Sequence, residues 1–317
     1  MSQHSGPQKK SMHPHQNSSS QVIIEEQSLR DGLQNEARLF SLAEKLEIIG
    51  LLVEAGIGRM QIGSFVDPRR VAQMRGIEKL AQRVHAQWPQ LVCSALVLNA
   101  QGLDRAVGCG MRHLSLSVSA SDSHSRANAG CAPGEALERM TGLVRKAVDL
   151  GITVRAGVQC AFGCVSENEV PAEAVLAAVQ RLAAAGATEI NLADTAGLAH
   201  PLQVRQLVTK IQPAVANKAL SLHLHDTRGL GLANLMAGYE AGVRLFDVAA
   251  GGLGGCPFVK DAAGNVATED AVHLFGRMGV ATGIDLHRLV MVVRRYEELL
   301  GRDLPGKMRR VLAPTNV

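Results

Sequence analysis

Leu222-His223-Leu224-His225-Asp226-Thr227 ends a leucine-rich run of this 317-residue chain. Alternate side chains of a β-strand point to the same face, so a strand here would aim His223 and His225 at one spot. Two convergent imidazoles form half of a metal site. Further along the chain follow Gly251-Gly-Leu-Gly-Gly-Cys256-Pro257 and Gly264-Asn265, a glycine-rich loop that ends in a polar side chain.

Short apolar runs alternate with longer amphipathic segments from residue 21 onward. The runs predict strands at 22–26, 59–62, 92–97, 113–118, 153–159, 189–192, 220–224 and 245–249. The segments between them predict helices near 41–56, 69–86, 99–109, 134–150, 171–186, 201–214, 229–242 and 266–279. Many of these end at an Ala-Gly or similar stop, such as Ala185-Gly186. This alternation of strands and helices predicts an α/β fold, a single (β/α)8 TIM barrel.

The ends of the chain differ from this pattern. An additional amphipathic helix over 284–300 follows the barrel, so 21–300 forms one catalytic domain. Residues 1–20 are rich in Ser, Gln and His and predict a disordered tail, and 301–317 predict a weakly ordered C-terminal tail. A doubly wound open sheet is the alternative architecture, but no G-x-G-x-x-G follows the first strand.

Composition excludes several classes of partner. The net charge is +4, with basic and acidic residues interspersed, so we expect no nucleic-acid partner. Apolar stretches fall short of the roughly 20 residues of a membrane span, so we expect no membrane segment. The six cysteines are scattered and 1–20 lack the apolar core of a signal peptide, which predicts free thiols in a reducing cytoplasm. Cys160 and Cys164 have no matching Cys or His pair nearby, so a structural zinc site is not expected.

Polar residues follow several of the predicted strands. In a (β/α)8 barrel the loops after the strands gather at one mouth, where the chemistry takes place. Residues far apart in the sequence would therefore meet there. They are Arg30, Asp31, Gln61, Asp194, Thr195, His223, His225, Asp226, Cys256 and Asn265.

Four of these residues offer metal ligands. Asp31 supplies a carboxylate oxygen, Asn265 an amide oxygen, and His223 and His225 two nitrogens. This mixed set, with room for water and substrate, predicts a six-coordinate Mg²⁺ or Mn²⁺ rather than a thiolate-bound zinc. Such a cation would polarise a substrate hydroxyl or carbonyl.

Two more residues suggest catalytic roles at this mouth. Arg30 offers a fork of donors to a developing oxyanion or a thioester oxygen. Cys256 lies in a loop so rich in glycine that a moving lid could deliver its thiol for proton transfer. Taken singly, a His-x-His pair, an Arg-Asp pair and a cysteine are more often structural. Their convergence on one barrel mouth favours an active site.

Three motifs together resemble the 3-hydroxy-3-methylglutaryl-CoA lyase family of metal-dependent barrels. They are Arg30-Asp-Gly-Leu-Gln-Asn-Glu36, His223-Leu-His-Asp-Thr227 and Gly252-Leu-Gly-Gly-Cys-Pro257 with Gly264-Asn-Val-Ala-Thr-Glu-Asp270. Shorter matches occur at Ser64-Phe-Val-x-Pro68, Ala161-Phe-Gly-Cys164 and Asp194-Thr195, so the resemblance covers about residues 21 to 300.

The resemblance implies retro-Claisen cleavage of a 3-hydroxyacyl-CoA to acetyl-CoA and a keto acid, which is acetoacetate for the namesake substrate. It assigns the metal ligands to Asp31, His223, His225 and Asn265. It also implies that Arg30 stabilises the enolate oxygen, that Cys256 transfers a proton, and that Asp194 handles protons or orients the substrate. An acyl-CoA substrate and a homodimer are implied as partners.

Two departures from the family pattern bear on the substrate. The family has a glutamate at the end of the second strand where this chain has Gln61, which cannot take a proton or carry charge. After the fourth strand, Ser119-Ala-Ser-Asp122-Ser-His124 replaces the usual Ala-Ser-Glu pattern. These differences leave three alternatives: a related lyase for citramalyl-CoA or an isoprenoid glutaryl-CoA, a synthase that runs the condensation, and a catalytically weakened barrel that binds metal or CoA.

Overall fold

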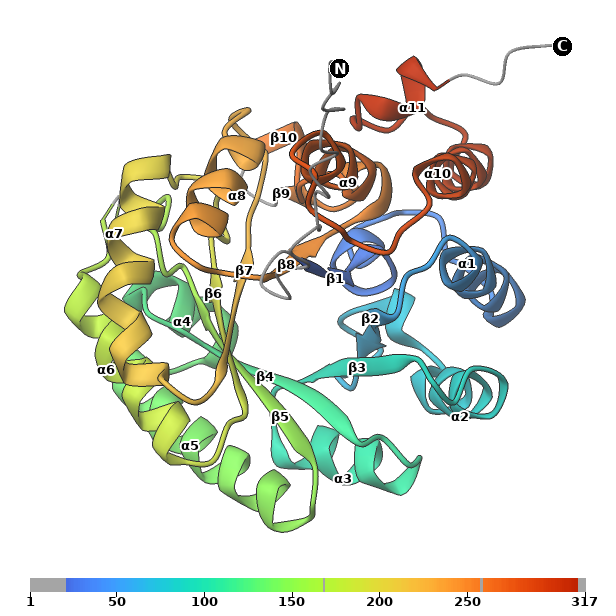
Figure 1. Cartoon of the computed structure of the whole chain (residues 1–317). Helices are drawn as coiled ribbons and strands as arrows, with labels where there is room; N and C mark the ends of the chain where they lie inside the picture. Colours follow the sequence, from blue (N-terminus) through green and yellow to red (C-terminus); the bar gives the residue numbers. More distant parts are fainter. Residues whose placement is uncertain (1–20, 168, 257–258, 313–317) are drawn as a thin grey trace, which may run out of the picture.

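Eight parallel strands close into a barrel in chain order, with β1 paired to both β2 and β8 (Figure 1). The computed structural model describes residues 21–167, 169–256 and 259–312, and between 255 and 263 it describes only the backbone. The predicted (β/α)8 barrel is confirmed. The strands are β1 (Ile23–Glu26), β2 (Arg59–Ser64), β3 (Val92–Val97), β4 (His113–Ser119), β5 (Thr153–Gln159), β6 (Glu189–Ala193), β7 (Ala219–His223) and β8 (Leu245–Val248).

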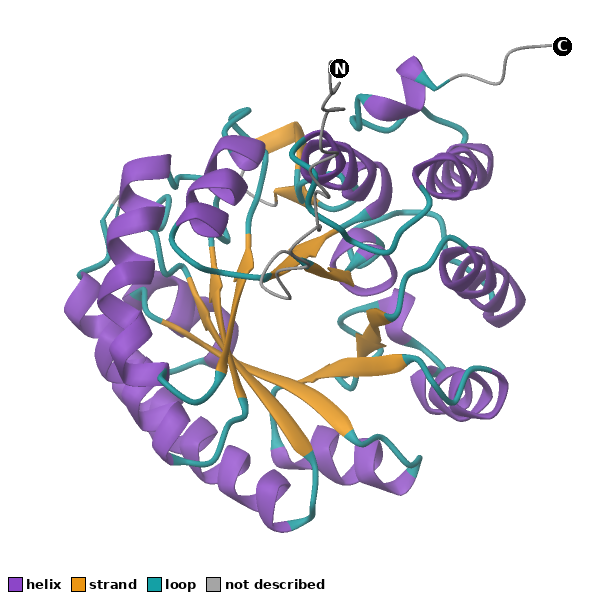
Figure 2. Ribbon diagram, in the orientation of Figure 1, coloured by secondary structure: helices purple, strands orange, loops and turns teal. Residues whose placement is uncertain are grey.

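Helices surround this barrel on its outside (Figure 2). They are α1 (Leu42–Glu54), α2 (Ile77–Gln87), α3 (Ala100–Gly108), α4 (Asp122–Ala129), α5 (Pro133–Asp149), α6 (Ala172–Ala184), α7 (Pro201–Ile211), α8 (Gly231–Glu240), α9 (Thr268–Arg277), α10 (Leu286–Leu300) and α11 (Met308–Val311). Helix α1 shows how the local sequence determines where a helix begins and ends. A capping box between Ser41 and Glu44 begins it, and Gly56 follows its end with a φ of +95°, where a Cβ would meet the Gly283 carbonyl oxygen at 2.4 Å.

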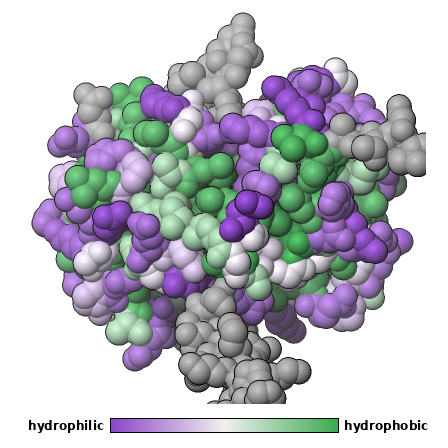
Figure 3. All heavy atoms as spheres, turned by 45° about the horizontal axis from the view of Figure 1, so that its top comes forward, coloured by the Kyte–Doolittle hydropathy of each residue, from purple (hydrophilic) through white to green (hydrophobic). Residues whose placement is uncertain are grey.

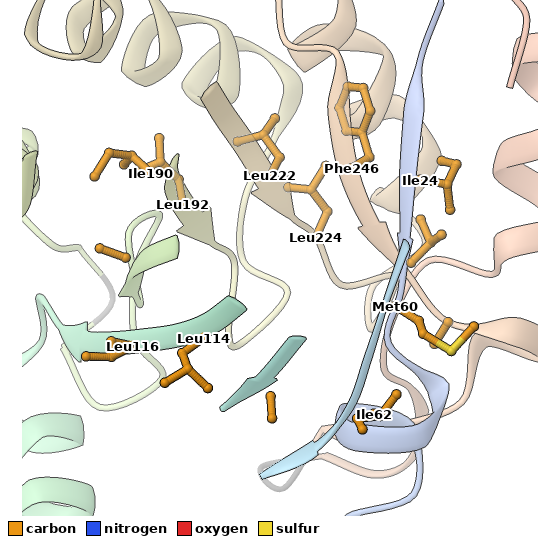
Figure 4. Packing of buried hydrophobic residues seen from close by; sticks show 14 of the residues in the cluster. Ile24, Met60, Ile62, Leu114, Leu116, Ile190, Leu192, Leu222, Leu224 and Phe246 are labelled. Atoms are coloured by element: carbon orange, nitrogen blue, oxygen red, sulfur yellow. The ribbon is translucent and has the colours of Figure 1, made fainter. Parts of the chain in front are cut away.

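The main apolar core lies between the strands and the surrounding helices. Side chains alternate along a strand, so on most of these strands the apolar ones pack against the helices and the polar ones face the barrel axis. On β4, Leu114 and Leu116 belong to the apolar layer, whereas Ser115 and Ser117 line the interior cavity. Figure 4 labels members of the apolar layer, namely Ile24, Met60, Ile62, Leu114, Leu116, Ile190, Leu192, Leu222, Leu224 and Phe246.

A buried ion cluster occupies the barrel interior around Arg155, whose side chain is only 1% exposed. Its guanidinium contacts Glu25 at 2.8 Å, Glu189 at 2.9 Å and Asp247 at 2.5 Å. Burial alone would lower the pKa of Arg155, but these carboxylates outweigh it and raise that pKa. Arg155 therefore keeps its charge, and removing a carboxylate partner would leave part of that buried charge unpaired, which costs about 3–5 kcal/mol.

Several short elements were not expected from the sequence. Helix α4 follows β4, capped by Ser121, which accepts from the backbone N–H of His124 at 3.1 Å. A single π-helical turn, η1 (Ser28–Gly32), follows β1 and carries Arg30 and Asp31. The glycine-rich loop contains two short antiparallel strands, β9 (Gly255–Cys256) and β10 (Val259–Ala263). Three 3-10 turns, η2 (Ala72–Met74), η3 (Gln212–Val215) and η4 (Ala250–Gly252), complete the structure.

The segment after α10 is packed rather than weakly ordered as far as Leu312. Leu304 is buried, the backbone N–H of Met308 donates to Asp270 at 2.8 Å, and Arg309 pairs with Glu297 at 2.7 Å. These contacts come from α9 and α10, so the segment's own sequence carries no sign of them. The predicted tail 1–20 and residues 313–317 lie outside the described residues.

The molecular surface mixes hydrophilic and hydrophobic residues over the face that Figure 3 shows. Among the described helices, none is both long and apolar enough to cross a membrane.

Glu269 connects the segment 301–312, which follows α10, to the beginning of the glycine-rich loop. It is fully buried, one carboxylate oxygen accepts from the backbone N–H of Gly251 at 2.9 Å, and a Cβ on Gly306 would lie 1.9 Å from the other. Burial raises the pKa of the Glu269 carboxyl to about 8. The folded protein therefore favours the protonated acid.

Replacing Glu269 with glutamine is expected to flatten the dependence of stability on pH. The folded pKa lies above the ordinary value of 4.5, so the stability that Glu269 contributes is complete below about pH 4.5 and is lost as the pH rises to about 8. Urea unfolding at pH 5 to 8 should show the wild type losing up to about 1.4 kcal/mol per pH unit relative to Glu269→Gln. Glu240→Gln, at an exposed ion pair, is the control. Parallel curves for Glu269→Gln and wild type would contradict the expectation.

Candidate metal centre and active site

The four predicted metal ligands meet at the carboxyl ends of the strands. Asp31 lies in η1 directly after β1, His223 ends β7, and His225 forms an isolated antiparallel bridge with Asn265. Ligand atoms of Asp31, His223 and His225 all lie within 4.8 Å of one another. Asn265 joins them, since its Nδ2 donates to Asp31 Oδ2 at 2.8 Å.

The geometry of this group suits a divalent cation. The Nε2 atoms of His223 and His225 lie 3.1 Å apart, and Asp31 Oδ2 lies 3.7 Å and 3.6 Å from them. Adjacent ligands of an octahedral ion at about 2.1 Å stand about 3 Å apart, so small shifts would place these atoms around one ion. Asn265 Oδ1 is buried and has no hydrogen-bond partner among the described residues, which leaves it available as a fourth ligand.

The charge of Asp31 also fits a ligand role. Its side chain is 12% exposed, and burial by itself would raise the pKa of its carboxyl. The guanidinium of Arg30 and the nearby imidazoles of His225 and His223 outweigh burial and lower this pKa well below its usual value. Asp31 is therefore ionised, as a metal ligand must be.

Asp247 orients the His223 ring through the nitrogen that does not face the candidate centre. The Asp247 Oδ2 atom lies 3.1 Å from His223 Nδ1, and Arg155 holds the same carboxylate at 2.5 Å. A carboxylate that accepts from Nδ1–H fixes the tautomer in which the Nε2 lone pair is free for a cation. Asp247 is thus a positioning residue that links the buried ion cluster to the candidate centre.

Replacing Asp247 with asparagine is expected to weaken Mn²⁺ binding about 10- to 100-fold, because the amide no longer fixes the His223 tautomer. Isothermal titration with Mn²⁺ measures the loss directly. Glu189→Gln is the matched control, since Glu189 also pairs with Arg155 and makes no hydrogen bond to His223. An equal loss of Mn²⁺ affinity in both variants would mean that the ion cluster acts only through the stability of the fold. Urea unfolding curves of both variants would then show the same loss of stability.

Arg30 is held beside Asp31 with its guanidinium lining the central cavity. Its Nε donates to Gln61 Oε1, its Nη1 to Asp31 Oδ1, and its Nη2 to Gln27 Oε1 at 3.2 Å. Gln61, on β2 and 1% exposed, therefore orients Arg30 through an uncharged amide. The guanidinium is fixed in one direction before any ligand arrives.

Asp194 and Cys256, the other two predicted catalytic residues, are placed differently. Asp194 is fully buried, and its two oxygens accept from the backbone N–H groups of Leu198 at 2.8 Å and Ala199 at 3.2 Å. Burial raises the pKa of its carboxyl. Asp194 does not line the cavity, so the structure gives it the geometry of a loop-holding residue. The backbone of Cys256 lies in β9, but its side chain lies outside the described parts, and both catalytic roles stay predictions.

A cavity of about 70 Å³ extends from the candidate centre into the barrel. Sequence reasoning missed much of its wall, although the Leu-Ser-Leu-Ser-Val-Ser alternation over 114–119 is a signal for inward polar residues. The residues lining the cavity are Arg30, Asp31, Gln61, Leu96, Ser115, Ser117, Arg155, Gly157, Gln159, Asn191, Ala193, Thr195, His223, His225 and Asp247.

Fold and site together define a (β/α)8 barrel with a candidate cation centre at the carboxyl ends of its strands. The family model described as HMGL-like matches residues 21–295. The chain therefore belongs to the HMGL-like family, as the motif resemblance implied.

Curated relatives and solved structures agree with this assignment. The (R)-citramalyl-CoA lyase of Chloroflexus aurantiacus is 40% identical over 294 residues, which cover 90% of this chain and 93% of that protein. The hydroxymethylglutaryl-CoA lyase of Pseudomonas mevalonii is 38% identical, with coverage of 88% and 93%. The structure of an HMG-CoA lyase from Acinetobacter baumannii in complex with coenzyme A and 3-methylmalate has a TM-score of 0.88 at 34% identity, with coverage of 95% and 98%.

Proposed function

We propose that this protein is a divalent-metal-dependent carbon–carbon lyase that cleaves 3-hydroxy-3-methylglutaryl-CoA or a closely related acyl-CoA. The products are acetyl-CoA and a keto acid. The observation that carries this proposal is the placement of Arg30 against Asp31, because it puts an oriented guanidinium beside the candidate cation centre in one cavity. Mg²⁺ or Mn²⁺ is the proposed cofactor, and an acyl-CoA thioester is the proposed partner.

The chemistry needs three things from the site. Asp31, His223, His225 and Asn265 would hold a cation, which supplies Lewis-acid polarisation of the substrate's hydroxyl and carbonyl oxygens. Transfer of the hydroxyl proton to solvent water and cleavage of the adjacent carbon–carbon bond turn the alcohol into a ketone and leave the electron pair on the enolate of acetyl-CoA. Arg30 donates to the enolate oxygen, where negative charge develops. The Cys256 thiol is proposed to protonate the enolate carbon, which completes acetyl-CoA.

The direct test is release of acetyl-CoA from a panel of 3-hydroxyacyl-CoA thioesters by the full chain with Mg²⁺ or Mn²⁺. Chelator-treated protein is the control and should be inactive until the cation is restored. If protein with titrated, bound Mn²⁺ released acetyl-CoA from no member of the panel, the lyase proposal would fail. Condensation of acetyl-CoA with a 2-oxo acid in the same protein would instead favour the synthase alternative.

Citramalyl-CoA is a second candidate substrate, which cleavage would convert to acetyl-CoA and pyruvate. It is favoured by the relative of 40% identity named (R)-citramalyl-CoA lyase and by the uncharged Gln61 next to Arg30. A glutamate there would carry charge that an amide does not. The identity of residue 61 is therefore proposed to tune the preference between the two thioesters.

Replacing Gln61 with glutamate is expected to shift the ratio of kcat/KM by about tenfold or more toward 3-hydroxy-3-methylglutaryl-CoA over citramalyl-CoA. A tenfold change corresponds to about 1.4 kcal/mol, within the range of one charge-assisted hydrogen bond. Steady-state assays with both thioesters measure this ratio. Gln61→Met serves as control, because it removes the acceptor for Arg30 and should slow both reactions alike. An unchanged ratio in Gln61→Glu would remove Gln61 from the specificity argument.

A further inference from the structure

Below the candidate cation centre, the barrel interior contains a small polar chamber. Its wall comes from three neighbouring strands: Ser115 and Ser117 on β4, Gly157 and Gln159 on β5, and Asn191 on β6. Arg30 and Asp31 line the same cavity, so the chamber and the candidate centre are continuous. Arg155 lines its inner end, paired with three carboxylates.

Gly157 keeps this chamber open. It lies inside β5, with Ser117 and Asn191 as its register partners on the two adjacent strands. Its backbone does not require glycine, because it is absent from the residues with positive φ. Glycine inside a strand weakens the strand and often marks a position that a ligand approaches closely.

Space at this position is limited to about one carbon. A Cβ added to Gly157 would lie 3.2 Å from Ser117 Cβ and 3.8 Å from Asn191 Oδ1. Alanine would therefore fit tightly, and any larger side chain would project into the cavity. The residue at position 157 sets how much of a ligand the chamber accepts.

The chamber also offers one polar group without a partner, beside one that is already paired. Ser117 Oγ is buried and has no hydrogen-bond partner among the described residues. Asn191 donates through Nδ2 to Ser221 Oγ at 3.0 Å. A buried hydroxyl without a partner costs free energy, and a ligand carboxylate or keto oxygen would satisfy it.

We propose that Gly157 opens a subsite for the acid end of the acyl group, which Ser117 binds, and that this subsite restricts the enzyme to acyl groups with a short acid end. The proposal rests on the proposed lyase function. The cavity has a volume of about 70 Å³ and Arg155 with its carboxylate partners lies at its inner end, so the acid end that it accepts is short.

The first experiment fills the chamber. Gly157→Val is expected to lower kcat/KM at least 100-fold for citramalyl-CoA and 3-hydroxy-3-methylglutaryl-CoA, with unchanged affinity for Mn²⁺ and free CoA. Gly157→Ala, which needs a shift of only a few tenths of an ångström, should give a smaller loss of the same kind. Gly142→Ala, where a Cβ meets no other group within 4 Å, is the matched control and should match the wild type. Retained Mn²⁺ and CoA binding shows that the variants are folded.

The second experiment removes the proposed hydrogen bond from each side. Ser117→Ala should lower kcat/KM about tenfold or more for 3-hydroxy-3-methylglutaryl-CoA, as expected for a lost hydrogen bond to a charged group. The same variant should show no such loss with 3-hydroxy-3-methylbutyryl-CoA, which lacks the terminal carboxylate. Equal losses on both thioesters would overturn the assignment of Ser117.

Two results separate this inference from the lyase function. Wild-type turnover that Gly157→Val leaves unchanged overturns the subsite and leaves the lyase intact. Lack of turnover of any thioester by the wild type overturns the lyase. In that case, titration of acetoacetate and pyruvate into the Mn²⁺-loaded protein still decides the subsite: binding lost in Gly157→Val supports it, and equal or no binding overturns it.

Discussion

Replacing His225 with alanine is expected to abolish measurable Mn²⁺ binding and to lower kcat for acetyl-CoA release about 10³-fold or more. His225 Nε2 lies 3.1 Å from His223 Nε2 and 3.6 Å from Asp31 Oδ2, so its loss leaves an incomplete set of ligands. Lewis-acid stabilisation by a cation is worth several kcal/mol, and about 1.4 kcal/mol corresponds to each factor of ten in rate.

Mn²⁺ titration and an acetyl-CoA assay on the same preparation check this expectation. His287→Ala is the control, because His287 lies at the beginning of α10 and outside the cavity lining. Millimolar Mn²⁺ should not restore His225→Ala fully, since the open position also disturbs substrate placement. A variant that binds Mn²⁺ with wild-type affinity would show that the cation site lies elsewhere.

Arg30 is the residue whose replacement should have the second-largest effect, with a different signature. Arg30→Lys is expected to lower kcat about 10²- to 10³-fold while KM and the Mn²⁺ affinity change little. A lysine keeps the charge but lacks the planar fork with which Arg30 contacts Gln61, Asp31 and Gln27 together. The lost interaction belongs to the transition state, where the enolate oxygen becomes negative.

Steady-state kinetics combined with Mn²⁺ titration separate this role from an effect on Asp31. Arg105→Lys, at an ion pair with Glu78 outside the cavity, is the control and should keep full activity. If Arg30→Lys instead lost Mn²⁺ affinity in proportion to kcat, Arg30 would act by keeping Asp31 ionised and not by contacting the substrate. Such a result would remove the enolate assignment.

The two expectations depend on different parts of the molecule. The cation site needs four residues that three separate stretches of chain deliver to one point. The orientation of Arg30 needs Gln61 from the neighbouring strand β2. If His225→Ala loses Mn²⁺ affinity while Arg30→Lys loses kcat and keeps its Mn²⁺ affinity, cation binding and charge stabilisation are separable functions of one cavity.

Local periodicity in the sequence was sufficient for the barrel and for half of the cation site. Strands β3 and β5 have the predicted bounds, and the other strands differ by one or two residues, because alternation and amphipathic spacing are properties of short windows. The pair His223 and His225 could be read from the period of two alone. The predicted barrel mouth then added Asp31 and Asn265, which are 234 residues apart in the chain, and the resemblance to the family assigned the same four ligands.

Only the tertiary structure decided the contacts that depend on barrel closure. The hydrogen bond between Asp247 and His223, the contact of Gln61 with Arg30 and the packing of residues 301–312 join separate elements, and no local pattern records them. The chamber around Gly157 likewise depends on contacts between separate strands. Its three wall residues Ser117, Gly157 and Asn191 become neighbours through strand register, which the closed barrel sets as a whole. Sequence therefore determined which side chains face inward, and the register of the closed sheet decided which of them meet.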